Sequence, residues 1–200
     1  MNTKWIIGTA LSLIILLAAC SQVQEYKEEE KKPIEATAPA IAQGDSTIVA
    51  LEKMFGGVSH EGAGSSVYPI SKEDVGPIDS VAWAKFKAYL GPKYTDSSAP
   101  YWKKGWEKVY VRKVHPDSSS NINTELSRHK DPRVKASVPL LLEFVQPVVK
   151  ARQALAGVYN RKDIKELAIF VIGDGEAYSG LLIAGRYKDG TGCTLVAMSD

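Results

Sequence analysis

The sequence has few of the residues that build disulfides and metal sites. It contains two cysteines, Cys20 and Cys193, and three histidines, His60, His115 and His129. The histidines are scattered, and none has a second ligand at the spacing of a metal-binding helix or hairpin. We therefore expect no metal and no cofactor.

The chain also lacks a large net charge and the short motifs of common enzymes. Its formal net charge is +2, which gives neither the positive field of a nucleic-acid-binding protein nor a strongly acidic surface. It has no Gly-x-Ser-x-Gly and no His-Glu-x-x-His sequence. Asp174 and Glu176 flank Gly175 as paired acids, but turn chemistry explains the aspartate. We therefore expect no catalytic residues and no enzyme.

No apolar run reaches the roughly 20 residues that a membrane-spanning helix needs. The longest follows Lys4, extends from Trp5 to Leu17 without a charge, and is followed by small residues. A positive start, a short apolar run and small residues before a cleavage site are typical of a secretory signal peptide. We expect residues 1–19 to be such a signal peptide.

The residues Leu17-Ala18-Ala19-Cys20 resemble the lipobox of bacterial lipoproteins. This resemblance implies that Cys20 is lipidated with acyl chains such as palmitate and becomes the first residue of the mature chain. Two or three acyl chains are enough for stable membrane anchoring. The protein is then expected in the cell envelope, with Ser21 favouring the outer membrane and a domain that faces the periplasm. The alternatives are a plain signal peptide that ends in cysteine and an uncleaved anchor helix.

Residues 20–45 are expected to form the lipidated cysteine and a flexible tether. Mixed charges fill residues 25–32, and prolines and small residues follow, so this segment cannot bury enough apolar surface to offset the entropy of ordering. Residues 46–200 are enough for one domain with a sizeable core. With Cys20 lipidated, Cys193 has no partner in the chain and is expected to be a small buried side chain in a strand.

Helical periodicity is clearest in two stretches. The first follows Asp45, a helix-capping residue, and ends before Gly56-Gly57. The second is predicted to begin at Ser137 and to continue as one long helix with a kink at Pro147, because proline removes a backbone donor. The polar residues 115–135 that precede it predict a long exposed loop.

The last forty residues predict an antiparallel meander. Three apolar runs are separated by turn sequences, and they cover residues 167–172, 179–187 and 193–198. Leu182 and Ala184 oppose Leu181 and Ile183, so both faces of the sheet need a cover. With helices before the meander, the fold class is predicted to be α+β, an α/β/α sandwich with an antiparallel sheet between helices.

The segment 94–110 interleaves aromatic side chains with lysines. Such a pattern can stack bases of single-stranded nucleic acid. The favoured interpretation is that the aromatics seal the core while the lysines face water, so nucleic acid is not an expected partner. An alternative function is a structural or small-ligand-binding envelope lipoprotein that uses this segment.

The domain resembles the nuclease A inhibitor-like family in pattern and order, over two blocks of the chain. The matching sequences are Ser65-Ser66-Val67-Tyr68-Pro69 after an opening helix, the run 167–173, the strand 181–185, the Asp189-Gly190 turn and a final strand. The resemblance implies an α/β/α sandwich that plugs the active site of a secreted, metal-dependent, non-specific nuclease. In that family an acidic residue of the Tyr-Pro loop and the chain terminus approach the metal.

Two positions depart from the family pattern. Ser65 stands where the loop glutamate is expected, and Asp200 stands in place of a terminal threonine. The resemblance implies that a protein partner, with a nuclease as the candidate, binds the 58–70 loop and the terminus through Ser65, Ser66, Tyr68, Pro69 and Asp200. We therefore predict an envelope lipoprotein whose domain is a nuclease inhibitor-like binding module.

Overall fold

The computed structural model describes residues 45–60, 63–112, 121–143 and 145–200. The predicted signal peptide 1–19, Cys20 and the tether up to residue 44 lie outside the described residues. Within the described ranges, no helix has both the length and the apolar character that crossing a membrane requires.

A six-stranded antiparallel sheet forms the centre of the domain, with the strand order β1-β2-β6-β5-β4-β3. Its strands are β1 (Val58–His60), β2 (Ala63–Ile70), β3 (Glu107–Val111), β4 (Ile164–Gly173), β5 (Ser179–Tyr187) and β6 (Gly192–Ser199). The predicted C-terminal meander is confirmed as β4, β5 and β6. These three strands lie in the middle, because β2 pairs with β6 on one side and β3 pairs with β4 on the other.

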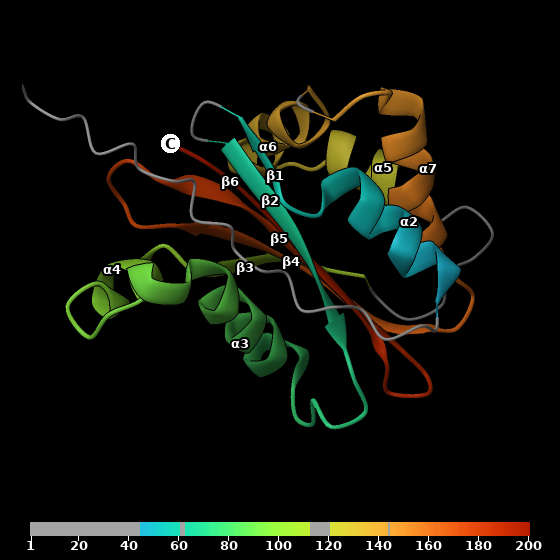
Figure 1. Cartoon of the computed structure of the whole chain (residues 1–200), viewed down its shortest axis with the longest axis horizontal. Helices are drawn as coiled ribbons and strands as arrows, with labels where there is room; N and C mark the ends of the chain where they lie inside the picture. Colours follow the sequence, from blue (N-terminus) through green and yellow to red (C-terminus); the bar gives the residue numbers. More distant parts are fainter. Residues whose placement is uncertain (1–44, 61–62, 113–120, 144) are drawn as a thin grey trace, which may run out of the picture. The chain divides into compact units, whose positions relative to one another are not determined.

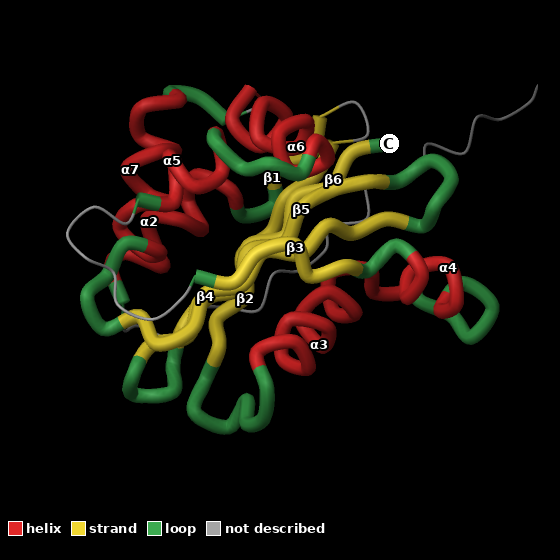
Figure 2. Tube along the Cα trace, turned by 180° about the vertical axis from the view of Figure 1, so that it is seen from behind, coloured by secondary structure: helices red, strands yellow, loops and turns green. Residues whose placement is uncertain are grey.

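Helices cover both faces of the sheet (Figure 1, Figure 2). One face carries α2 (Ser46–Phe55), α5 (Ile122–Ser127), α6 (Pro132–Glu143) and α7 (Val148–Tyr159). The other face carries α3 (Ile78–Leu90), the short 3₁₀ helix η1 (Gly91–Lys93) and α4 (Ala99–Lys104). The prediction of an α+β fold with a sheet between two helical layers is therefore confirmed.

Alternate residues of the central strands point into two separate cores. Leu181 and Ile183 pack with the side chains of α2 and α7, whereas Leu182 and Ala184 pack with those of α3. Successive side chains of a strand point to opposite faces, so a strand that is apolar at every position needs a helix layer on each side.

The first predicted helix is α2, and its start is fixed as the sequence indicated. The Asp45 side chain accepts a hydrogen bond from the Thr47 backbone N–H at 2.9 Å. This contact satisfies one of the donors that a helix N-terminus leaves free. Ile48, Leu51 and Phe55 lie on the buried face of the helix.

The prediction of one kinked helix from Ser137 is wrong. The segment forms two helices, α6 from Pro132 and α7 from Val148, and Pro147 is the residue directly before α7. Proline lacks an N–H and its ring clashes with the preceding helical turn, so it is favoured at a helix start and disfavoured within one. Pro139, in contrast, lies inside α6.

The prediction of a long loop over 115–135 is also wrong where the structure describes it. Residues 121–135 contain α5 and the start of α6, and the Asn121 side chain caps α5 by accepting from the Asn123 N–H at 2.9 Å. The apolar pattern of α5 consists of Ile122 and Leu126, both buried. Two apolar residues in a polar segment are too weak a signal to predict a helix.

Candidate functional site

The pairing of β2 with β6 brings the two predicted binding segments to one end of the sheet. Gly64 lies opposite Met198, and Ser65 lies opposite Ala197. The turn between β4 and β5 reaches the same end, because Ser179 pairs with Ser199. We call the surface made by Gly64, residues 174–178 and residues 199–200 the carboxyl-terminal end of the sheet.

The prediction that residues 58–70 form a loop is wrong, because residues 58–60 and 63–70 form the paired strands β1 and β2. Ser65, Ser66 and Tyr68 are buried in β2. The Ser65 hydroxyl donates to the Phe55 carbonyl at 2.7 Å, across to the end of α2. These side chains therefore contribute to the core and to the packing of α2, and they do not form an exposed polar surface.

Tyr68 of β2 and Tyr89 of α3 lie on the face of the sheet that α3 covers, which is the face away from α2. The Tyr89 hydroxyl donates to the Gly64 carbonyl at 3.4 Å. Burial raises the pKa of Tyr68 and raises the pKa of Tyr89 to about 12. Both phenols are therefore neutral at physiological pH and act as hydrogen-bonding groups of the fold.

Two exposed acidic residues and one neighbouring lysine mark the carboxyl-terminal end of the sheet, since Lys93 Nζ lies 5.0 Å from the centre of the Tyr178 ring. Asp200 and Glu176 are both exposed. Asp174 stabilises the turn between β4 and β5, since its Oδ1 accepts hydrogen bonds from the backbone N–H groups of Glu176 at 2.9 Å and Tyr178 at 3.0 Å. The prediction that this aspartate is a turn residue is therefore confirmed. Pro69 lies apart from this end, because it pairs with Cys193 toward the far end of β2.

No group of three or more histidine, cysteine or acidic side chains is placed to hold a metal in the part of the chain that the structure describes. His129 packs edge-on against Tyr110, with ring centroids 5.8 Å apart. Its Nδ1 accepts from the Asp131 N–H at 3.1 Å. This ring therefore has contacts that fix the start of α6.

The aromatic segment 94–110 packs mainly into the core beneath α3. Trp106 stacks on Phe170 with ring centroids 4.5 Å apart and lies edge-on to Trp83 at 5.0 Å. Trp102 is buried against Phe86. The interpretation that these aromatics seal the core is confirmed.

A buried ion pair that was not predicted from the sequence links α5 to the residue after β3 and to the end of α7. Arg112 donates to both carboxylate oxygens of Glu125, at 2.9 and 2.5 Å, and to the Tyr159 carbonyl at 2.5 Å. The three residues lie far apart in sequence, so no local pattern could have predicted their contact.

Arg161 links the start of α2 to the end of α7. Its guanidinium contacts the Asp45 carboxylate, forms a two-bond pair with Asp163 at 2.9 and 2.6 Å, and lies 3.8 Å from the centre of the Tyr187 ring. The Arg161 hydrogen bonds lower the pKa of Asp163. Burial alone would raise the pKa of Asp45, but its hydrogen bonds from Thr47 and its contact with Arg161 lower it.

The contacts of Arg161 with Asp45 and Asp163 are expected to make the stability of the domain depend on pH in the acidic range. Both carboxyls have a folded pKa below the ordinary value of 3.8, so the stability that they add is present above about pH 4 and is lost as the pH falls through the folded values. We expect Arg161→Gln to flatten the loss of unfolding free energy between pH 5 and pH 2, measured by urea titration. Arg152→Gln, on an exposed position of α7, is the control and should leave this slope unchanged. If Arg161→Gln loses unfolding free energy with falling pH as steeply as the unchanged chain, these ion pairs do not contribute to its acid sensitivity.

Cys193 is buried in β6, as predicted from the sequence. Burial raises the pKa of its thiol to about 12, and the thiolate is the reactive form of cysteine. We expect no reaction of this thiol with 5,5′-dithiobis(2-nitrobenzoate) at pH 8 in the folded protein, and rapid reaction in urea. Labelling of Cys193 in the folded state, located by peptide mass spectrometry, would contradict the buried position.

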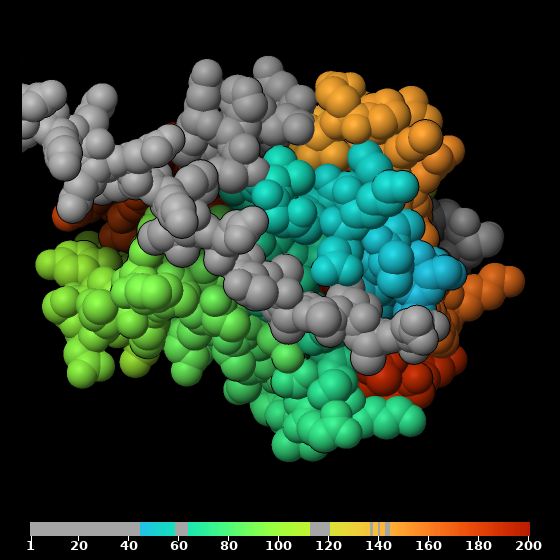
Figure 3. Space-filling view, in the orientation of Figure 1, coloured from blue at the N-terminus to red at the C-terminus, as the bar shows by residue number. Residues whose placement is uncertain are grey.

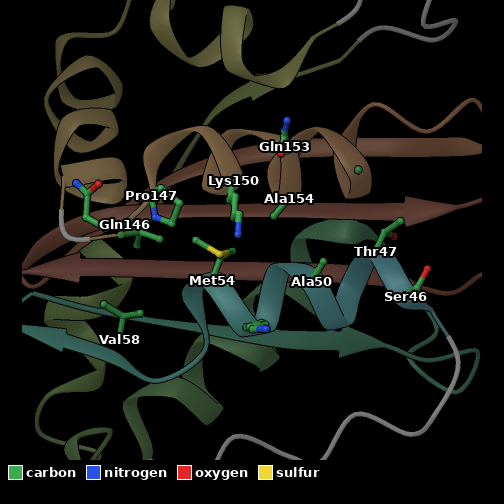
Figure 4. A pocket seen from close by; sticks show the side chains of 13 residues that line it. Ser46, Thr47, Ala50, Met54, Val58, Gln146, Pro147, Lys150, Gln153 and Ala154 are labelled. Carbon is green, nitrogen blue, oxygen red and sulfur yellow. The ribbon is translucent and has the colours of Figure 1, made fainter.

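A groove of about 730 Å³ lies between α2 and α7 and was not predicted from the sequence. Its walls are mostly apolar or small, and among the described residues that line it Lys53 and Lys150 are the charged ones. Figure 4 shows the Lys150 side chain extending from α7 toward α2, next to Met54. Ala50 and Ala154 leave the space open, but small residues on separate helices give no local signal of a groove.

Comparisons with known proteins give no relative of this chain. No family model, curated protein or solved structure matches it.

Proposed function

We propose that the protein is a bacterial envelope lipoprotein whose domain binds a protein partner at the carboxyl-terminal end of the sheet. Lipidated Cys20 holds the chain in the membrane, and the tether up to residue 44 lets the domain stand away from it. The domain works as a binding module and not as an enzyme.

The pairing of β2 with β6 is the observation that supports this proposal. It joins the β1–β2 hairpin and the C-terminal residues, which are separated by more than a hundred positions in the sequence, on one rigid sheet. Asp200 and Glu176 are exposed at this end, and their negative charges outnumber the positive charge of the neighbouring Lys93. Complementary charge favours a partner with a basic surface at the contact, because it speeds encounter and fixes orientation.

A secreted, metal-dependent nuclease is the partner that the family resemblance implies. Ser65 is buried and donates to Phe55, so it is not the group that approaches a metal. The exposed carboxylate of Asp200 is the better candidate, because oxygen ligands of this kind suit hard divalent cations.

The test is inhibition of such a nuclease by the full chain, with and without residues 199–200. We expect inhibition that rises with protein concentration, is lost on the deletion, and is strongly weakened by Glu176→Lys. Glu73→Lys, an exposed acid beyond the far end of β2, is the matched control and should inhibit normally. Absence of inhibition by the intact chain, or inhibition that survives the deletion, would refute the nuclease assignment.

The membrane anchor has its own test. Globomycin blocks the signal peptidase that processes lipoproteins, so treated cells should accumulate the unprocessed precursor, and Cys20→Ser should leave the membrane fraction. The mature protein should carry acyl chains on Cys20 by mass spectrometry. An unmodified Cys20 thiol on protein from untreated cells would refute the anchor and leave the nuclease test unaffected.

A further inference from the structure

We propose that the groove between α2 and α7 binds a fatty acid, with the carboxylate between Lys53 and Lys150 and the alkyl chain along the apolar walls. This site is separate from the carboxyl-terminal end of the sheet and does not depend on the partner proposed there. Both helices lie at the surface on the same face of the domain (Figure 3).

The size and lining of the groove suit an amphiphile. Its volume of about 730 Å³ lies within the range of roughly 300–1,000 Å³ that is usual for small-molecule sites. Met54, Val58, Val145, Pro147 and Ala154 supply apolar wall, and Met54 is a side chain that adapts to irregular ligands. An alkyl chain suits such walls, because its binding removes apolar surface of both the ligand and the groove from water.

The two lysines face the same part of the groove, between its two ends. The helices run antiparallel, since Thr47 at the start of α2 lies against Gly157 near the end of α7. Lys53 near the end of α2 and Lys150 near the start of α7 therefore lie across from each other, and the groove continues past them to Val58, Val145 and Pro147. A ligand that places one charged group there can lay apolar chain against the groove on both sides, past Ala50 in one direction and against Val58, Val145 and Pro147 in the other.

Nothing among the described residues neutralises these lysines. None of the groove's lining residues is acidic, and neither lysine has an acidic partner in the described ranges. Other basic side chains do pair, as Lys85 does with Asp74 at 2.8 Å. Lys150 also lies in the first turn of α7, where the helix dipole disfavours a cation. The presence of Lys150 at this position is therefore not explained by helix stability, but it is explained if the lysine binds an anionic ligand.

The test is binding of palmitate to the full chain by isothermal titration calorimetry, below the concentration at which palmitate aggregates. The N-terminal segment is the same in every variant, so differences between variants report on the domain. We expect Lys53→Gln and Lys150→Gln each to weaken binding about fivefold, as for the loss of an exposed ion pair. Ala50→Phe should fill the groove and weaken binding about tenfold or more.

Matched controls lie on the same helical layer. Lys135→Gln on α6 and Val49→Phe on α2 change exposed residues outside the groove and should bind palmitate as the unchanged chain does. Hexadecanol, which lacks the carboxylate, should bind more weakly than palmitate and be insensitive to the lysine changes. Hexanoate, which lacks most of the chain, should show no measurable binding.

Three results would overturn the proposal. Palmitate binding that is absent, or that is unaffected by Ala50→Phe, would show that the groove is not a fatty acid site. Equal binding of hexadecanol and palmitate would show that the lysines do not bind the carboxylate. Dimerisation of the chain without ligand that Ala50→Phe abolishes, measured by light scattering, would assign the groove to a second copy.

Discussion

Replacement of Phe170 by alanine is expected to lower the free energy of unfolding by about 4 kcal/mol. Phe170 is fully buried at the centre of β4 and stacks on Trp106 at 4.5 Å. The surrounding side chains are aromatic rings on a sheet, so they cannot collapse fully into the space that the ring leaves. The loss then includes both the transfer of the ring and the cavity. Urea unfolding of the full chain, followed by tryptophan fluorescence and circular dichroism, measures it.

Tyr101→Ala is the control for this change. Tyr101 belongs to the same aromatic segment as Trp106, but 53% of it is exposed. Its replacement should change the free energy of unfolding by no more than about 0.5 kcal/mol. A loss below about 1 kcal/mol for Phe170→Ala would mean that the core beneath α3 is not packed as described.

The second large effect is expected at the buried pair of Arg112 and Glu125. Glu125→Ala leaves the Arg112 guanidinium buried without its counter-ion and should destabilise the domain by about 3 kcal/mol. Arg112→Met should cost less, because the Glu125 side chain is 17% exposed against 5% for Arg112 and can turn toward water. The double variant Arg112→Met/Glu125→Leu should recover most of the loss, since no charge is then left buried.

The exposed pair of Lys108 and Asp79 provides the comparison. These side chains lie 2.7 Å apart but are 39% and 44% exposed, and exposed pairs contribute little to stability. Lys108→Gln should therefore cost no more than about 1 kcal/mol in the same urea experiment. If the double variant at Arg112 and Glu125 is as unstable as Glu125→Ala, the loss does not come from an unpaired charge.

The sequence predicted the elements whose signals are local. The runs of β4, β5 and β6 are separated by turn residues, and their apolar residues on both faces required two helical layers. The Asp45 cap of α2 and the buried position of Cys193 followed from the same kind of reasoning. Each of these features depends on neighbours within a few positions, which is the distance over which periodicity and capping act.

Two of the errors lie where a local pattern fits two structures. Pro147 predicted a kink but separates two helices, because a proline suits a helix start as well as a bend. Residues 58–70 were predicted to be a loop, yet Ser65 and Ser66 are buried in a strand. Their hydroxyl groups find partners inside the fold, such as the Phe55 carbonyl, and only the tertiary structure provides those partners.

The sequence by itself determined the α+β class, the central meander with its two-sided cover, and the expectation of a lipid anchor at Cys20. Tertiary structure alone decided which distant segments meet. It places β2 beside β6, Arg161 beside Asp45 across 116 positions of sequence, and Lys53 in the same groove as Lys150. Such contacts arise because each element buries its apolar face against whatever complementary surface the whole chain offers, and residue order along the chain does not encode that choice locally.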